Sequence, residues 1–309
     1  MTNYQSESLM AVQANVKFRE RLNKGFAIAG LGIIVVSVLI LLLLVLGMFF
    51  QGIGRLTPQF FLNFPSRNPE EAGILSAWVG TILVMSVTAI ISVPVGIASG
   101  IYLEEYARKN WLADVIEINV TNLAGVPSIV YGLLALGLFV YQFKLGQSIL
   151  AAGLTLALLI LPIVIVTTRE SLRAIPSSLR EAAYALGASK WQMIWDHILP
   201  YSLGSIMTGI IIGLSRAIGE TAPVITIGAL TFIAFLPDSP FQDFPKNVFA
   251  WLFAPFTVMP IQMFNWVSRP EPEFEVNAAA AGTVLTVMTL SMNGLAIYLR
   301  YHFRKGIKW

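Results

Sequence analysis

The chain has 309 residues, of which 56% are apolar and only 12% are charged, and its formal net charge is +3. Soluble domains carry about a quarter charged residues, so this composition indicates a polytopic membrane protein. The basic residues are scattered at the ends of apolar segments without an aromatic-interleaved patch, which argues against nucleic acid as a partner. No cysteine is present, which excludes disulfides and thiolate metal sites.

An apolar helix of about 20 residues crosses the hydrocarbon core of a bilayer, and six segments meet this requirement. They are residues 26–50, 74–103, 120–143, 146–168, 202–236 and 278–301. The first follows a polar leader and lacks an obvious small-residue cleavage site, so we expect it to remain as an anchor. The second and fifth are longer than needed and contain Pro94 and Pro223, which predicts a tilt, a kink or a break in each. The predicted fold class is all-α, with six transmembrane helices surrounded by membrane lipid.

The distribution of Lys and Arg between the loops predicts the orientation of these helices. One set of loops and termini holds fourteen basic residues: Lys17, Arg19, Arg21, Lys24, Arg108, Lys109, Arg169, Arg173, Arg180, Lys190, Arg300, Arg304, Lys305 and Lys308. The opposite loops hold five: Arg55, Arg67, Lys144, Lys246 and Arg269. Because cytoplasmic loops carry the excess of basic residues, both termini are expected in the cytoplasm (N-in and C-in).

The cytoplasmic loop at 169–200 contains the sequence EAAYALGASKWQMIWDHILP. Ser178 stands three residues before Glu181, which is a capping-box arrangement, and Gly187 suits the left-handed position that ends a helix. Small Ala182 and Ala183 would let another protein approach closely, while Glu181 offers a charge to a basic partner. The alternative is an amphipathic surface helix without a partner. No phosphate loop is present in the sequence, so ATP would have to be hydrolysed on a separate subunit.

Arg216 and Glu220 are the clearest charges inside an apolar segment, where each costs about 2.5 to 3.5 kcal/mol on insertion scales. They are four residues apart on one predicted helical face. Arg216 offers a planar fork of donors to an oxyanion, whereas Glu220 accepts a hydrogen bond only from a ligand that carries a proton. Phosphate carries such a proton at neutral pH and sulfate does not, so the pair favours phosphate. The alternative is an ion pair that neutralises itself or joins two helices.

Neighbouring polar residues extend this predicted pathway. Thr221 directly follows Glu220, and Ser128 or Tyr131 in the run LAGVPSIVYG is a further candidate. Core packing around a proline kink is the alternative role for that run. Two glycine pairs, at 96 and 100 and at 209 and 213, predict close helix contacts, within this chain or with another.

Several other polar residues are expected to have no chemical role. The acidic residues are predicted to form a solvated cytoplasmic face rather than a catalytic pair: Glu104, Glu105, Asp114 and Glu117. His197 and His302 stand alone, so no metal site is expected. No catalytic constellation lies in the apolar segments, so the chain is not expected to be an enzyme.

Segment 181–200 follows the spacing of the EAA loop of ABC-transporter permeases, with Glu181, Ala182 and Ala183, then Gly187, then Leu199 and Pro200; only the aliphatic position differs, being His197. Four further stretches resemble the membrane subunits of the phosphate-specific transport system, most closely the PstA type. They are EEAGILSAWVGTILV at 70–84, VPVGIASGIYLEEYA at 93–107, LAGVPSIVYGL at 123–133 and SRAIGETAPVITIGA at 215–229. The resemblance runs from about residue 52 to residue 305.

This resemblance implies a type I ABC permease fold in the inner or plasma membrane of a prokaryote. It divides the chain into a cytoplasmic leader (1–25), a first transmembrane helix with an outer loop (26–72), a permease domain (73–303, with the coupling loop at 169–200) and a cytoplasmic tail (304–309). Glu181, Ala182, Ala183 and Gly187 would contact the ATPase. Arg216 and Glu220 would match the charged pathway residues of the family.

The resemblance also implies partners and substrate. These are a homologous permease subunit of the PstC type, an ATPase dimer of the PstB type that binds ATP and Mg²⁺, and an extracytoplasmic phosphate-binding protein of the PstS type. The chain itself would hold no cofactor. The expected function is that of a permease subunit of an ATP-driven importer of inorganic phosphate. The alternatives are a permease for another oxyanion or solute, and a proton-coupled secondary transporter that uses Glu220 as its relay.

Overall fold

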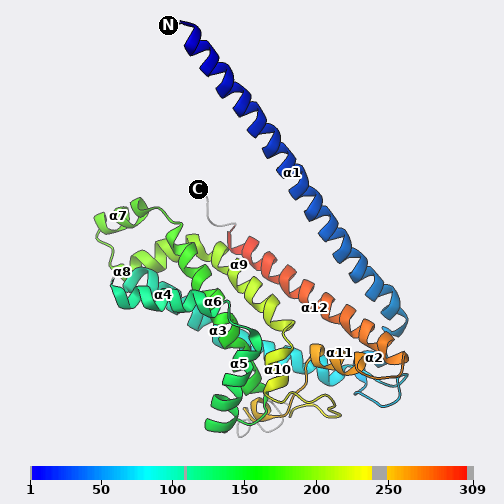
Figure 1. Cartoon of the computed structure of the whole chain (residues 1–309). Helices are drawn as coiled ribbons and strands as arrows, with labels where there is room; N and C mark the ends of the chain where they lie inside the picture. Colours follow the sequence, from blue (N-terminus) through cyan, green and yellow to red (C-terminus); the bar gives the residue numbers. More distant parts are fainter. Residues whose placement is uncertain (1, 108–109, 239–248, 305–309) are drawn as a thin grey trace. The chain divides into compact units, whose positions relative to one another are not determined.

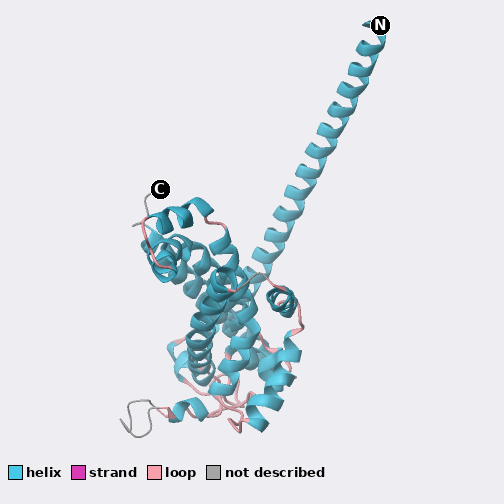
Figure 2. Ribbon diagram, turned by 90° about the vertical axis from the view of Figure 1, so that its left-hand side faces the viewer, coloured by secondary structure: helices cyan, strands magenta, loops and turns pink. Residues whose placement is uncertain are grey.

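The computed structural model describes residues 2–107, 110–238 and 249–304, and their regular structure is helical (Figure 2). Five basic residues used above for orientation, together with the rest of segment 305–309, lie outside the described residues: Arg108, Lys109, Lys246, Lys305 and Lys308. The chain divides into two compact units, Met1–Gln51 and Gly52–Trp309, and each is described by itself.

The first unit consists of a single long helix, α1 (Thr2–Gly52), whose last residue, Gly52, already belongs to the second unit. The helix contains the predicted first span and runs on through the described part of the predicted leader. Most apolar side chains from Phe26 to Phe50 are exposed, on all sides of the helix. A helix that is apolar on every side is stable only in an apolar surrounding, and the span at Phe18–Arg55 is long enough to cross a membrane.

The second unit is built around four long helices: α3 (Leu75–Ile101), α6 (Ile149–Arg173), α9 (Leu199–Ile218) and α12 (Glu273–Arg304). Helices α3 and α6 make the most extensive contact. A Cβ atom at Gly100 of α3 would come within 2.6 Å of Thr168 on α6, so the missing side chain is what lets the two backbones approach. The glycine pair in α3 therefore packs within this chain.

Between these helices are shorter elements: η1 (Ile53–Arg55), α2 (Pro58–Leu62), η2 (Tyr102–Tyr106), α4 (Trp111–Leu123), α5 (Ser128–Ala135), η3 (Leu136–Gln142), α7 (Ser177–Ala185), α8 (Lys190–Gln192), η4 (Met193–Ile198), α10 (Ala222–Thr226), η5 (Ala250–Phe253) and α11 (Met259–Val267). Their order along the chain can be followed in Figure 1. Of these, η2, η3 and η4 are π-helical turns that continue a neighbouring α-helix.

The predicted third span, 120–143, is not one continuous helix. Helix α4 ends at Leu123, α5 begins at Ser128, and the two halves are bent by 106°. Pro127 explains the break, because it lacks a backbone N–H and disfavours helical conformation in the residue before it. The described residues contain five helices long and apolar enough to cross a membrane, or six if this bent pair counts as one span.

The predicted fifth span, 202–236, is also interrupted, and the expected break is present. Helix α9 ends at Ile218, and Pro223 lies in the first turn of the short helix α10. Gly228 then takes a left-handed conformation, with φ of 93°, which terminates this short helix. By contrast, Pro94 is accommodated inside an uninterrupted α3.

Candidate pathway site and coupling surface

The charged pair lies where α9 stops. Arg216 is in the last turn of the helix, and Glu220 follows two residues after the helix ends. The Nε atom of Arg216 donates to Oε1 of Glu220 over 3.2 Å. The sequence placed both residues on one helical face, but the chain turns at Gly219, whose N–H donates to the Arg216 carbonyl. The two side chains therefore meet across a helix end rather than along a helix.

Each member of this pair keeps capacity for another partner. The Arg216 side chain is 40% exposed and Glu220 is 17% exposed. Among the described residues Arg216 uses only Nε in a hydrogen bond, and a guanidinium carries five N–H donors. The geometry thus forms the ion pair given above as an alternative to anion binding, while the terminal nitrogens of Arg216 stay open to an incoming anion.

The other predicted pathway residues lie in α5 and at the start of α10. Thr221 is half-buried and directly precedes α10. Ser128 begins α5 and is half-buried, and the structure records no contact of its side chain with Arg216 or Glu220. Tyr131, one turn further along α5, lies within electrostatic range of Arg216. Its hydroxyl donates to the Leu123 carbonyl over 2.8 Å, which ties α5 to the end of α4.

The described residues form one small cavity at the charged pair. A cavity of about 10 Å³ adjoins Glu220, with Thr81, Val84 and Val258 among its walls. That volume holds at most one water molecule and is too small for a tetrahedral oxyanion. The open side of Arg216 would therefore need a wall from another chain to make a closed site.

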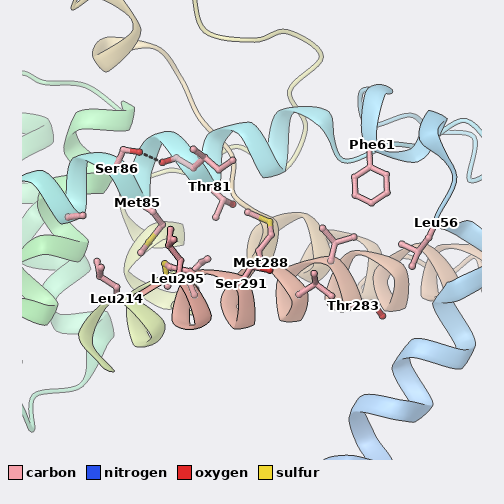
Figure 3. Close-up of a pocket in the computed structure, with 16 residues that line it drawn as sticks. Leu56, Phe61, Thr81, Met85, Ser86, Leu214, Thr283, Met288, Ser291 and Leu295 are labelled. Atoms are coloured by element: carbon pink, nitrogen blue, oxygen red, sulfur yellow. Dashed lines mark hydrogen bonds between the residues drawn. The ribbon is translucent and has the colours of Figure 1, made fainter. Parts of the chain in front are cut away.

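A larger cavity of about 790 Å³ lies between α3 and α12 and reaches Leu214 on α9 (Figure 3). Its walls are almost entirely apolar. Three of its hydroxyl groups donate to carbonyls of their own helices, those of Thr81, Ser86 and Thr283. An anion entering this groove would lose its hydration without gaining charged donors, so the groove does not suit an oxyanion.

The predicted coupling residues divide between two faces of α7. Glu181 and Ala182 are exposed, whereas Ala183 is buried against Leu172 and Met193. Gly187 is exposed and has a φ of 83°, the left-handed conformation predicted for it. A partner would thus meet Glu181 and Ala182 at the surface, while Ala183 holds the helix against the end of α6 and against η4.

The predicted capping box at Ser178 is wrong. Helix α7 begins at Ser177 after Pro176 and has no side-chain cap, because the rigid proline already sets the chain direction at the helix start. A capping box is present one helix later, between Ser189 and Gln192.

The acidic residues predicted to be solvated are mostly paired, and this is the feature that sequence reasoning missed. Glu105 is only 8% exposed and pairs with Arg180, while Glu104 and Glu117 pair with basic residues of α6. Asp114 alone of the four is exposed and has no ion pair with a described residue. Arg169 and Arg173 are four residues apart at the end of an apolar segment and so share one face of a helix. This spacing was the available signal that acidic residues would pair with them.

Comparisons with known proteins identify the family of this chain. Residues 92–308 match the family model described as "Binding-protein-dependent transport system inner membrane component". The phosphate transport system permease protein PstA of Yersinia pestis is 35% identical over 252 residues, which cover 80% of this chain and 79% of that protein. The protein of the same name from Pasteurella multocida is 32% identical over 258 residues, 84% of this chain and 86% of that protein.

The fold has solved counterparts. A chain of the MetNI methionine ABC transporter in an inward-facing conformation superposes with a TM-score of 0.52 at 15% identity, covering 73% of this chain and 91% of that chain. At this identity the likeness concerns the fold alone. With several apolar helices of spanning length, an exposed loop of the EAA spacing and a family match over most of its length, the chain belongs to the family of binding-protein-dependent transport system inner membrane components, which are multi-pass permeases.

Proposed function

We propose that this chain is a permease subunit of an ATP-driven importer of inorganic phosphate. The observation that carries the proposal is the Arg216–Glu220 pair at the interrupted end of α9. It is supported by the relatives from Yersinia pestis and Pasteurella multocida, which are named as phosphate transport permeases.

The chemistry of the pair suits a protonated oxyanion. Arg216 presents terminal N–H donors that can bind two phosphate oxygens at once. Glu220 can accept a hydrogen bond from the hydroxyl group of the monohydrogen phosphate ion but repels a fully ionised sulfate. In the empty state the two side chains neutralise each other, and an arriving phosphate replaces part of that interaction. Thr221 and Ser128 are proposed as further pathway residues.

The complete machine needs other chains. We propose a second permease subunit of the PstC type to close the open side of Arg216, because the cavity that described residues form beside Glu220 measures about 10 Å³. An ATPase dimer of the PstB type would bind ATP and Mg²⁺ and dock on Glu181, Ala182 and Gly187. A phosphate-binding protein of the PstS type would deliver the substrate from outside. Both termini would lie in the cytoplasm of a prokaryotic cell.

The test is uptake of labelled phosphate into proteoliposomes that hold the complete complex and its binding protein, with and without ATP and with excess sulfate. We expect uptake that requires ATP and that sulfate does not compete away. Uptake that responds equally to sulfate would replace phosphate with a broader oxyanion substrate. Uptake that ignores ATP but collapses when the proton gradient is dissipated would favour a secondary transporter instead.

Arg216→Gln tests in the same experiment whether Arg216 serves transport. It should abolish most of the uptake while the complex still assembles and hydrolyses ATP. Loss of the assembled complex would instead mean that the pair serves only to hold the fold together.

A further inference from the structure

Three acidic and three basic side chains form a cluster at the cytoplasmic ends of four elements of the second unit. We call these six residues the ionic cluster: Glu104, Glu105, Glu117, Arg169, Arg173 and Arg180. The acids come from η2 and α4, and the bases from α6 and α7. Glu170 of α6 also faces Arg173, at 3.9 Å, from the exposed edge of the cluster.

Arg180 is the member that attaches the coupling helix. Its Nη2 atom lies 2.8 Å from Oε1 of Glu105 in η2, and the same nitrogen donates to the Leu172 carbonyl over 2.8 Å. Its Nη1 atom donates to the Ile175 carbonyl over 2.7 Å. One guanidinium thus binds the carbonyls of Leu172, in the last turn of α6, and of Ile175, just beyond that helix, and joins α7 to η2, which continues α3.

Arg169 extends the cluster to α4. Its side chain is only 9% exposed, and Nη2 lies 2.8 Å from Oε2 of Glu117. Its Nε atom faces Glu104 at 3.6 Å, an ion pair longer than a hydrogen bond. A buried guanidinium needs its counter-charges in place, so Arg169 holds α4 and η2 in a set position against the end of α6.

Helix α4 leads from this cluster to the charged break. Across the 106° bend, the Tyr131 hydroxyl of α5 is bonded to the last residue of α4. Helix α5 then packs on α10 so closely that a Cβ atom at Gly132 would lie within 2.7 Å of Pro223. Pro223 lies three residues after Glu220. The bent pair α4–α5 therefore connects the ionic cluster to the Arg216–Glu220 pair through packed contacts.

We propose that Arg169 is a positioning residue that couples the cytoplasmic coupling helix α7 to the charged break at Arg216 and Glu220, by holding the bent pair α4–α5 through Glu117. Movement of α7 is carried by Arg180 to the end of α6, by Arg169 of α6 to Glu117 of α4, and by α5 to α10. This inference rests on the proposed function, since it assumes that an ATPase moves α7.

The test replaces Glu117 by Gln in the complete complex reconstituted with its binding protein. This change removes the charge that faces Arg169 and keeps the size of the side chain. We expect ATP hydrolysis and the amount of assembled complex to remain, while phosphate imported per ATP hydrolysed falls on the order of tenfold, within the usual range of coupling between sites. A purely structural role would lower the amount of complex and leave this ratio unchanged.

Asp114→Asn is the matched control. It removes a carboxylate from the same helix, one turn earlier, at a position with no ion pair to a described residue. We expect its ratio to equal that of the unmodified complex. An equal fall for Asp114→Asn and Glu117→Gln would overturn the inference, since the effect would then come from charge on α4 in general. Glu117→Asp keeps the charge and should recover part of the ratio.

Should Glu117→Gln fail to assemble, Arg169→Lys decides the matter. Lys keeps the positive charge but lacks the planar fork that reaches both Glu104 and Glu117. We therefore expect the same fall in phosphate imported per ATP hydrolysed. An unchanged ratio would overturn the inference.

The proposed function is tested separately by the unmodified complex and by Gly187→Trp, which alters the exposed coupling loop. If Gly187→Trp uncouples hydrolysis from uptake while Glu117→Gln does not, the role of Arg169 is refuted and the function stands. If the unmodified complex shows no ATP-dependent phosphate uptake, the proposed function itself fails.

Discussion

Arg216 and Glu220 show how two residues can hold opposite charges at low cost until a substrate arrives. Each would be expensive to bury alone, and their contact at 3.2 Å compensates for part of that cost. The end of α9 at Ile218 matters as much as the charges, because it frees Glu220 from the helix and leaves Arg216 partly exposed. The pair can therefore exchange partners without unwinding a helix.

The side chain of Glu220 is expected to set the selectivity between phosphate and sulfate. Glu220→Gln should lower the preference for phosphate about tenfold or more, because a hydrogen bond to a charged group contributes about 1.5 to 3 kcal/mol and the Gln amide can also donate to sulfate. Competition of sulfate with labelled phosphate uptake measures the change. Glu220→Asp retains the charge and serves as the control; an unaltered preference in Glu220→Gln would remove Glu220 from the selectivity argument.

Helices α4 and α5 show how an interrupted element can connect two distant parts of the second unit. Pro127 breaks the segment, and the Tyr131 hydroxyl restores a fixed relation between its halves. At the other end, Gly132 allows α5 to lie directly on the backbone of α10. Glycine is required at this contact for its lack of a side chain and not for its conformational freedom.

Gly132→Ala tests this close contact. The added methyl group would overlap Thr226 and Pro223, and overpacking of this kind costs about 1 to 3 kcal/mol. Because the backbone at Pro223 is rigid, we expect α10 to be displaced as a whole. Phosphate uptake should then fall severalfold or more in an assembled complex.

Gly137→Ala provides the control for that variant. Gly137 lies in η3, which continues α5, and a Cβ atom there meets nothing within 4 Å. Its uptake should match that of the unmodified complex. Equal uptake by both variants would show that the α5–α10 contact tolerates displacement and does not govern the charged break.

At the scale of the whole molecule, this chain is one part of a larger assembly. The second unit leaves one side of Arg216 open and encloses about 10 Å³ beside Glu220. The helix of the first unit exposes apolar side chains along its membrane-spanning stretch. The sequence contains no phosphate loop for ATP. In the proposed function, the membrane, a second wall for the pathway and the energy source are supplied from outside the chain.

Reconstitution of the chain alone tests this dependence. We expect no phosphate uptake above that of empty vesicles, with or without ATP, because the pathway is incomplete and nothing hydrolyses the nucleotide. The complete complex in the same lipids should restore uptake, and removal of Mg²⁺ with a chelator should abolish it again. Uptake by the isolated chain would contradict both the proposed assembly and the ATP-driven mechanism.

The sequence by itself determined the membrane class, the helical fold, the family of the EAA loop and the charged residues near Pro223. These features follow from local composition and spacing, because an apolar stretch of spanning length, a proline or a left-handed glycine acts on its own neighbourhood. Gly187 and the break near Pro223 are such cases, and both were predicted.

Only the tertiary structure decided which charges meet. The partners of Glu105 and Glu117 are 75 and 52 residues away along the chain, at Arg180 and Arg169. Spacing in sequence can mark Arg169 and Arg173 as neighbouring bases on one helix face, but it does not say which acids they meet. The inward packing of Ala183 likewise depends on neighbouring helices. Packing between distant segments decides these features, because burial and ion pairing are properties of the folded neighbourhood and not of any one segment.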